Sequence, residues 1–255
     1  MRIVTDLREW QSMRDTLSNK TIGFIPTMGN LHEGHLSLCR RSIAENEITL
    51  MSIFVNPTQF NEASDFDTYP RTLMQDQQLL STLAIDYLLL PKASEIYADH
   101  YELQVSETNI STVLEGEHRP GHFTGMLTVV LKLLNLARAT KAYFGEKDFQ
   151  QLLLIQKMAA AFFLPTTIVA CPTLRADDGL ALSSRNARLS EADREKAADF
   201  PRLLQGTLDV ASVKTELERL GFTVEYIAEK WGRRLGAVRL GNVRLIDNGT
   251  YDVIA

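Results

Sequence analysis

The chain has 255 residues, which is enough for a sizeable core and one or two domains. Its hydrophobic content of 45% and charged content of 23% are ordinary for a soluble globular protein. The formal net charge of −5 argues against nonspecific binding of nucleic acid, because no overall basic excess exists to release counterions from phosphates. A local cationic pocket is compatible with this charge.

Cysteine usage and hydropathy indicate a cytoplasmic protein without a membrane span. The two cysteines, Cys39 and Cys171, are far apart and form no CxxC motif, which disfavours a disulfide framework or a zinc site. The N-terminus, MRIVTDLREW, carries charges where a signal peptide has an apolar run. The longest apolar stretch, 126–136, contains Lys132 and is too short to cross a bilayer.

The chain begins with alternating strands and helices. We expect a strand at Ile3 and Val4, and then a helix capped by Asp6 that buries Trp10, Met13 and Leu17. Further strands are predicted at 22–26, 48–55, 87–90, 142–144 and 167–170. Helices are predicted at 33–45, 72–82 and 123–138, and a further helix after the strand at 142–144 ends at about residue 163. This alternation predicts an α/β fold with a Rossmann-like, doubly wound parallel sheet over residues 1–175.

The pattern changes in residues 176–255. A polar loop leads to a charged helix that Pro201 bends or ends, and a second helix spans 212–220. Alternating segments at 224–227, 236–240 and 243–246 predict paired strands, and Asp247-Asn248-Gly249 is a turn signal. We therefore expect a smaller α+β C-terminal domain that serves as a lid.

The first candidate site follows the strand at 22–26. A compact turn of Thr27, Met28, Gly29 and Asn30 precedes two histidines at the start of the next helix. A helix N-terminus delivers backbone N–H groups and a positive dipole end to a phosphate. An isolated HxxH pair is more often a surface or packing feature, but its place after a strand and a glycine turn favours a phosphate site.

Three further polar clusters follow other strands: Asn56 with Gln59, Gly145 to Asp148 with Gln151, and Ser183-Ser184-Arg185. Each has a structural alternative. Asn56 can cap a strand before a proline, Lys147 and Asp148 can form an ordinary helix start, and the serines can belong to a solvated turn. The carboxyl ends of parallel strands are where open α/β sheets bind ligands, so four clusters at equivalent positions favour one shared site.

These residue types suit adenylyl or phosphoryl transfer. Lys147 and Arg185 can neutralise a departing pyrophosphate, and the two histidines can donate to phosphate oxygens. The sequence lacks GxxxxGK[ST], GxGxxG and GxSxG, which disfavours P-loop hydrolysis, NAD binding and a hydrolase elbow.

Six motifs occur in the order typical of one family. They are PTMGNLHEGH (26–35), SIFVNPTQF (52–60), YPRT (69–72), LEGEHRPGHFTG (114–125), YFGEKDFQQL (143–152) and DGLALSSRN (178–186). Together they resemble the pantothenate synthetase (pantoate–β-alanine ligase) family of the HxGH nucleotidylyltransferase superfamily. The resemblance runs from about residue 22 to residue 190, and RLGNVRLIDN at 239–248 is similar to the family's C-terminal strand pair.

The resemblance implies an ATP-dependent ligation in two steps. The carboxylate of pantoate attacks the α-phosphate of ATP, which gives pantoyl adenylate and pyrophosphate. The amine of β-alanine then attacks the mixed anhydride, which gives pantothenate and AMP. Mg²⁺ is the implied companion of the phosphates, and a lid is expected because the adenylate hydrolyses easily. The loop at 119–125 and the second domain are the candidates for that lid.

The resemblance also implies roles for individual residues. ATP is expected to contact Met28, Gly29, Asn30, Leu31, His32, Glu33, Gly34, His35, Gly145, Glu146, Lys147, Asp148, Leu174, Leu182, Ser183, Ser184 and Arg185. Among these, His35 matches the family's catalytic proton donor, and His32, Lys147 and Arg185 join it as catalytic candidates. Pantoate is expected between Gln59 and Gln151, β-alanine beside Gln59, and Asn56 in the same substrate site.

The sequence departs from the family at two places. Gln75 and Asp76 stand where a pair of acidic residues is expected, so Asp76 is the one candidate Mg²⁺ ligand. The second domain is short and matches poorly over 200–223, in a family whose members are usually homodimers. Two other functions stay open: a nucleotidylyltransferase that releases a stable nucleotide-linked product, and a nucleotide sensor with a decayed site. The intact histidines, Lys147 and Arg185 disfavour the sensor.

Overall fold

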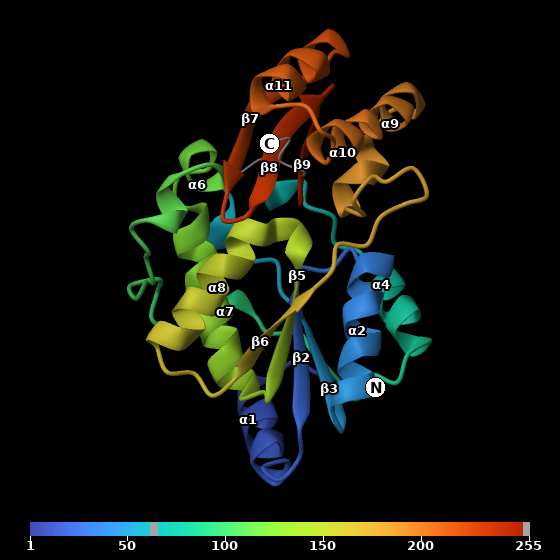
Figure 1. Ribbon diagram of the computed structural model, residues 1–255. Helices are drawn as coiled ribbons and strands as arrows, with labels where there is room; N and C mark the ends of the chain where they lie inside the picture. Colours follow the sequence, from blue (N-terminus) through green and yellow to red (C-terminus); the bar gives the residue numbers. More distant parts are fainter. Residues whose placement is uncertain (62–65, 252–255) are drawn as a thin grey trace. The chain divides into compact units, whose positions relative to one another are not determined.

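The computed structural model describes residues 1–61 and 66–251 and divides into two compact units (Figure 1). The first unit comprises Met1–Leu31, His35–Gly145 and Gln150–Cys171. The second comprises Pro172–Ala255 together with two short pieces, His32–Gly34 and Glu146–Phe149. The sequence predicts one boundary after residue 175, and the two short pieces have no counterpart in that prediction.

The first unit contains one six-stranded parallel sheet, as the sequence predicts. Its strands are β1 (Arg2–Val4), β2 (Ile22–Thr27), β3 (Ile48–Ile53), β4 (Tyr87–Leu89), β5 (Lys141–Gly145) and β6 (Thr167–Cys171). They lie in the order β1-β4-β3-β2-β5-β6, and every pair is parallel. The chain runs outward from β2 through β3 and β4, and later from β5 to β6 on the opposite side. The switch point of this doubly wound sheet is therefore between β2 and β5.

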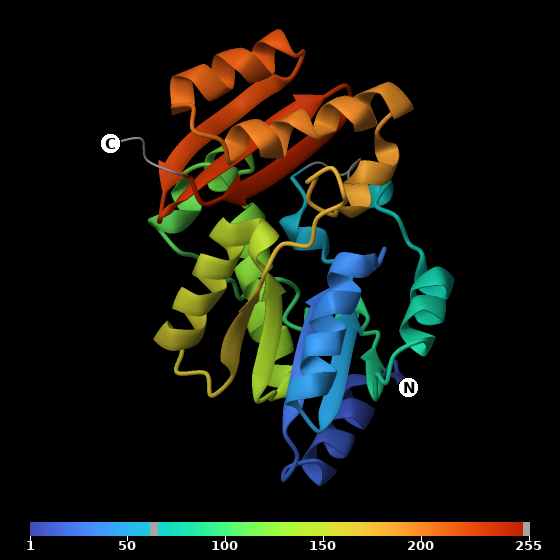
Figure 2. The same cartoon turned by 45° about the vertical axis from the view of Figure 1, so that its right-hand side comes forward.

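Helices flank this sheet (Figures 1 and 2). The longer ones are α1 (Leu7–Thr16), α2 (Glu33–Glu45), α4 (Leu73–Ser81), α7 (His122–Ala137) and α8 (Phe149–Ala161). Short helical segments are η1 (Pro57–Gln59), α5 (Ala93–Ile96), η2 (Ile110–Thr112), α6 (Glu115–His118) and η3 (Glu146–Asp148). One core cluster joins Leu36 and Cys39 of α2 and Leu80 of α4 to Ile25 and Met51 of the sheet. None of the helices in the described part of the chain combines the length and apolar character needed to cross a membrane.

Helix α1 corrects one detail of the prediction. Asp6 caps it through bonds from two backbone N–H groups, and Trp10 is fully buried, both as predicted. The other buried residues are Leu7 and Arg14, whereas Met13 and Leu17 are only partly buried. The Arg14 guanidinium donates to the carbonyls of Ala137 and Arg138, at the C-terminal end of α7. A helix end leaves carbonyls without partners inside the helix, so a buried arginine is stable there.

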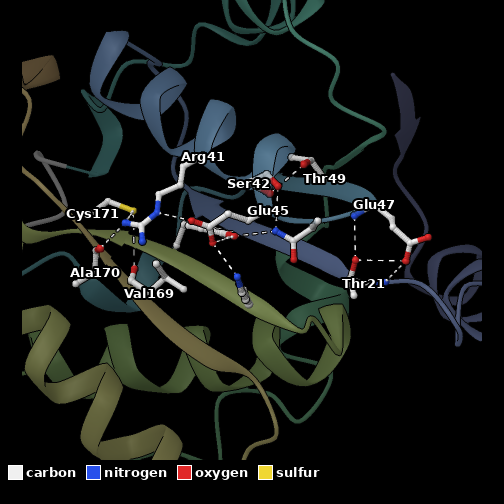
Figure 3. A network of polar contacts seen from close by, with 12 residues as sticks. Thr21, Arg41, Ser42, Glu45, Glu47, Thr49, Val169, Ala170 and Cys171 are labelled. Atoms are coloured by element: carbon white, nitrogen blue, oxygen red, sulfur yellow. Dashed lines mark hydrogen bonds and ion pairs between the residues drawn. The ribbon is translucent and has the colours of Figure 1, made fainter.

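A polar network fixes α2 on the sheet (Figure 3). The Arg41 guanidinium donates to the Ala170 carbonyl at 2.8 Å and to the Glu45 carboxylate at 2.9 Å. Glu45 also accepts hydrogen bonds from Lys141 and the Tyr143 hydroxyl of β5, each at 2.9 Å. These bonds tie the C-terminal half of α2 to the two strands on one side of the switch point.

The second unit is a small α+β domain, as predicted. The antiparallel strands β7 (Thr223–Lys230), β8 (Arg233–Leu240) and β9 (Val243–Gly249) form its sheet. Its helices are η4 (Ser184–Arg188), α9 (Glu191–Ala197), α10 (Asp199–Leu204) and α11 (Val210–Arg219), and Phe200, Leu204 and Leu217 are almost fully buried in its core. The charged helix stops at Ala197, because Pro201 has no N–H to offer the carbonyl four residues earlier.

Two loop predictions are wrong. Asp247, Asn248 and Gly249 belong to β9 rather than to a turn, and both polar side chains are nearly inaccessible. The turn between β7 and β8 is instead formed by Trp231 and Gly232, which have φ values of 56° and 73°. Two positive φ values in a two-residue hairpin loop are typical of a type I′ turn. The loop predicted at 119–125 is shorter than expected, because α6 ends at His118 and α7 already begins at His122.

Candidate active site

The carboxyl ends of β2 and β5 lie at the switch point of the sheet, where open α/β folds bind ligands. The turn with Met28 and Gly29 follows β2, and Gly145 ends β5. Asn56 and Gln59 follow β3, the other neighbour of β2. Because all strands of this sheet are parallel, these predicted site residues of the first unit lie at the same edge of the sheet.

The buried carboxylate of Asp76 holds the turn after β2. It accepts hydrogen bonds from the backbone N–H groups of Asn30 at 3.0 Å and Leu31 at 2.8 Å. The Thr72 hydroxyl donates to the same carboxylate at 3.2 Å. Gly29 and Asn30 have φ values of 80° and 52°, a left-handed backbone conformation that needs such support outside glycine. Asp76 therefore acts in this structure as the anchor of the turn.

This geometry bears on the predicted metal site. Asp76 is 2% exposed, and its two oxygens already accept backbone N–H groups. Within residues 1–61 and 66–251, no group of three or more histidine, cysteine or acidic side chains is arranged to hold a metal ion. The donor set therefore does not fit a protein cage for a metal, and the role of Asp76 as a Mg²⁺ ligand stays a prediction.

Asn56 and Gln59 form one buried amide pair. The Asn56 amide group donates to Gln59 Oε1 at 3.1 Å and to the Gly125 carbonyl at 3.2 Å. Its oxygen accepts from the hydroxyls of Thr58 and Tyr97, so all the usual hydrogen-bonding capacity of Asn56 is occupied. Gln59 Nε2 lies 3.0 Å from the Met28 sulfur, which brings this pair to the turn after β2.

The start of α7 supports Gln59, a role that the sequence does not reveal. His122 Nδ1 donates to the Gln59 carbonyl at 2.8 Å, so its Nε2 is the acceptor for the Arg119 guanidinium at 3.1 Å. Gly125 packs directly on the η1 backbone, and a Cβ there would come within 2.1 Å of the Thr58 carbonyl oxygen. The only signal in the sequence is the glycine and histidine content of the 114–125 motif.

The two glutamines at the start of α8 have different positions. Gln150 is 3% exposed and bonds to three backbone groups, those of Ile110, Val113 and Glu115, so it joins α8 to the η2 region. Gln151, the predicted pantoate contact, is partly buried on the same helix. His35 is also partly buried, in the first turn of α2.

Three of the predicted ATP contacts in the second unit, His32, Lys147 and Asp148, interact electrostatically. The Nδ1 of His32 accepts a hydrogen bond from the Gly34 backbone N–H at 3.1 Å, which leaves the ring proton on Nε2. Burial, and next to it the charge of Lys147, lowers the pKa of His32, so the ring is neutral near pH 7. Lys147 Nζ lies 3.8 Å from the Asp148 carboxylate. The structure therefore brings His32, Lys147 and Asp148 into one electrostatic environment.

A short hairpin-like loop carries the last predicted cluster. The Leu182 N–H donates to the Leu174 carbonyl at 2.9 Å, and the turn contains Gly179 with a φ of 85°. Ser183 caps η4 by accepting the Arg185 N–H, and a Cβ added at Gly34 would be in van der Waals contact with the Leu182 Cβ. The structure thus joins Leu182 to the His32 segment, while Ser184 and Arg185 lie partly exposed in η4.

Comparison with known proteins places the chain in a family. The family model described as pantoate-beta-alanine ligase matches residues 1–250. The chain belongs to the pantoate–β-alanine ligase family. It is 51% identical over 249 residues to pantothenate synthetase of Legionella pneumophila (strain Corby), covering 97% of this chain and 99% of that protein. Pantothenate synthetase of Coxiella burnetii (strain RSA 331 / Henzerling II) is 47% identical over 247 residues, 97% and 96% of the two chains.

Solved structures of the family have the same fold. The crystal structure of pantoate-beta-alanine ligase from Francisella tularensis, complexed with beta-gamma ATP and beta-alanine, has a TM-score of 0.93 and 42% identity, and the match covers 98% of this chain and 97% of that one. Pantothenate synthetase from Thermus thermophilus has a TM-score of 0.90 and 37% identity over 99% and 100% of the chains. The predicted family, the fold class and the enzyme class are confirmed.

Proposed function

We propose that this chain condenses pantoate with β-alanine at the expense of ATP, through a pantoyl-adenylate intermediate, and releases pantothenate, AMP and pyrophosphate. The observation that carries the proposal is the full-length likeness to a ligase whose crystal structure holds beta-gamma ATP and beta-alanine. The intact cluster of His32, Lys147 and Asp148 supports it from this chain's own residues.

The adenylation step is a problem of positioning and charge stabilisation. A carboxylate needs no base to attack the α-phosphate, so a rate gain comes from alignment and from donors to the developing charge. His32 is neutral and offers its Nε2 proton, and Lys147 offers a cation that is only 19% exposed. His35 and Arg185 complete the proposed set of donors to the phosphates.

Pantoate recognition is assigned to Gln59 and Gln151. A primary amide can donate to a carboxylate and accept from a hydroxyl, which are the groups that pantoate presents. Asn56 is proposed here as the support of Gln59, since its own donors and acceptors are occupied. β-Alanine is placed beside Gln59, where its amine has to reach the adenylate carbonyl.

The proposal also covers the metal ion, the cellular location of the protein and its oligomeric state. Mg²⁺ usually keeps several waters and binds through substrate phosphates, so it is proposed to enter with ATP rather than to occupy a preformed protein cage. When bound, it would neutralise phosphate charge. A cytoplasmic location and a homodimer are retained as proposals from the cysteine pattern and from the family.

Product analysis tests the function. With ATP, pantoate and β-alanine, the protein is expected to form AMP and pantothenate in equal amounts. Pyrophosphate–ATP exchange is expected to need pantoate but not β-alanine. Exchange without pantoate, or no exchange until β-alanine is added, would contradict the two-step route. A stable nucleotide-linked product would instead identify a simple nucleotidylyltransferase.

A further inference from the structure

Asn248 makes an unusual set of contacts in the second unit. Its side chain is buried, with 2% of the residue exposed, at the carboxyl end of β9. The amide group donates to the backbone carbonyls of Glu146 at 2.8 Å and Lys147 at 3.0 Å. Both N–H groups of the amide therefore donate to two consecutive peptide groups of η3. This segment carries Lys147, the cation proposed to bind the phosphates of ATP.

Arg233 completes this clamp. Its guanidinium donates to Asn248 Oδ1 and to the Glu146 carboxylate, each at 2.8 Å. It also lies over the Phe149 ring, 4.4 Å from the ring centre. The arginine thus fixes the orientation of the Asn248 amide and contacts the first residue of η3, Glu146, and the residue that follows η3, Phe149.

We propose that Asn248, oriented by Arg233, is a positioning residue for Lys147: it fixes the Glu146–Asp148 backbone so that the Lys147 ammonium meets the phosphates of ATP. The proposal rests on the proposed function. Lys147 has a flexible stem of four carbons, so the direction of its charge depends on where its backbone is held. A misplacement of about 1 Å in an active site can cost on the order of 100-fold in rate.

A double-mutant cycle distinguishes positioning from a general structural role. The four proteins are the wild type, Asn248→Ala, Lys147→Ala and the double variant, each assayed for pantoate-dependent pyrophosphate–ATP exchange. Asn248→Ala is expected to slow exchange about 10-fold or more with Lys147 present. With Lys147→Ala, the same substitution is expected to slow it less than about 3-fold, because residues that act through one group are not additive.

Two further variants make the test specific. Asn242→Ala is the matched control, since Asn242 is an exposed asparagine between the strands β8 and β9, and it is expected to leave exchange unchanged. Asn248→Asp keeps the shape of the side chain and the bond from Arg233 but removes both N–H donors. It is therefore expected to give the same result as Asn248→Ala in both Lys147 backgrounds. It also serves if Asn248→Ala fails to fold.

The outcomes separate this inference from the function itself. If the wild type shows no pantoate-dependent exchange, the proposed function is contradicted. The double-mutant cycle would then use the dissociation constant of ATP, measured for the same four proteins. Equal losses in both Lys147 backgrounds, or a folded Asn248 variant with normal exchange, would overturn the positioning role. If neither Asn248 variant folds, Asn248 is a folding residue and the proposal fails.

Discussion

Asp76 is the residue at which two roles can be separated by experiment. Its carboxylate receives the Asn30 and Leu31 N–H groups, whereas the family resemblance also implies a metal ligand. Asp76→Asn replaces one acceptor oxygen with a donor that faces N–H groups. We expect a loss of ATP affinity of about 10-fold or more, because the backbone of the proposed ATP site is displaced. Excess Mg²⁺ is expected not to restore it.

Titration calorimetry with ATP at several Mg²⁺ concentrations checks this. Full recovery at high Mg²⁺ would identify Asp76 as a metal ligand and contradict the anchoring role. The control is Asp15→Asn, the same chemical change at a side chain that is 68% exposed and forms an ion pair with Arg138. Exposed ion pairs contribute little to stability, so this variant is expected to bind ATP normally.

Alanine substitutions of Lys147 and His35 test their assignment as donors to the phosphates. Removing one donor to transition-state charge typically costs about 100-fold or more in rate. We expect each alanine variant to lose that much in a single-turnover adenylation assay, with a smaller change in ATP binding. A variant that keeps a near-normal single-turnover rate would remove its residue from the phosphate site.

The helix α7 and the segment η1 depend on one glycine. A Cβ at Gly125 would lie 2.1 Å from the Thr58 carbonyl oxygen and 2.8 Å from the Gln59 backbone nitrogen. Gly125→Ala has to push η1 away and carry Gln59 with it. We expect a loss of about 1–3 kcal/mol in the free energy of unfolding, typical of overpacking, and weaker pantoate binding. Thr124→Ala, one position earlier, is the control; an unchanged pantoate dissociation constant in Gly125→Ala would separate Gln59 from pantoate.

The network of Figure 3 links α2 to the sheet and predicts acid sensitivity. Hydrogen bonds from Arg41, Lys141 and Tyr143 lower the pKa of Glu45 to about 2. A carboxyl whose pKa is lower in the folded state stabilises the fold above its unfolded value, near 4.5, and loses that contribution as pH falls toward 2. Glu45→Gln is therefore expected to flatten the dependence of the melting temperature on pH between about 5 and 2. Glu102→Gln, at an exposed glutamate, should keep the wild-type dependence. Equal slopes in all three proteins would contradict the role of the network.

Local patterns explain which elements the sequence predicts. Helix α2 begins at Glu33 and ends at Glu45, as predicted, because an apolar periodicity starts just after a glycine turn. The Asp247-Asn248-Gly249 prediction failed because its decisive partners are distant in sequence: Arg175, Arg233 and the Glu146 carbonyl. The same limit applies to the site. Motifs identify segments such as 26–35, but only the fold shows that Asp76 and Asn248 hold them.

At the scale of the whole molecule, the proposed pantoate contacts belong to the first unit, whereas each unit holds some of the proposed ATP contacts. Gln59 and Gln151 lie in the first unit, as do the ATP candidates of the turn after β2, and the second unit holds His32, Lys147 and the loop of Leu174 and Leu182. That loop is anchored by Arg175, whose guanidinium makes a two-bond ion pair with the buried Asp247 at 2.6 and 2.9 Å. A change to this pair acts within the second unit and is expected to affect ATP rather than pantoate.

Asp247→Asn tests whether this loop serves ATP rather than pantoate. The substitution leaves Arg175 without its counter-charge. Breaking a fully buried ion pair lowers the free energy of unfolding by about 3–5 kcal/mol. Because Arg175 is 24% exposed, we expect a smaller loss of roughly 2 kcal/mol here. ATP affinity is expected to fall, while the dissociation constant of pantoate stays within about 2-fold, because sites without shared contacts are nearly independent. Gln59→Ala should give the opposite pattern, with weaker pantoate and unchanged ATP. Fluorescence titrations of both ligands on both variants decide it: parallel losses of the two affinities in either variant would contradict the assignment of the 174–182 loop to ATP and of Gln59 to pantoate.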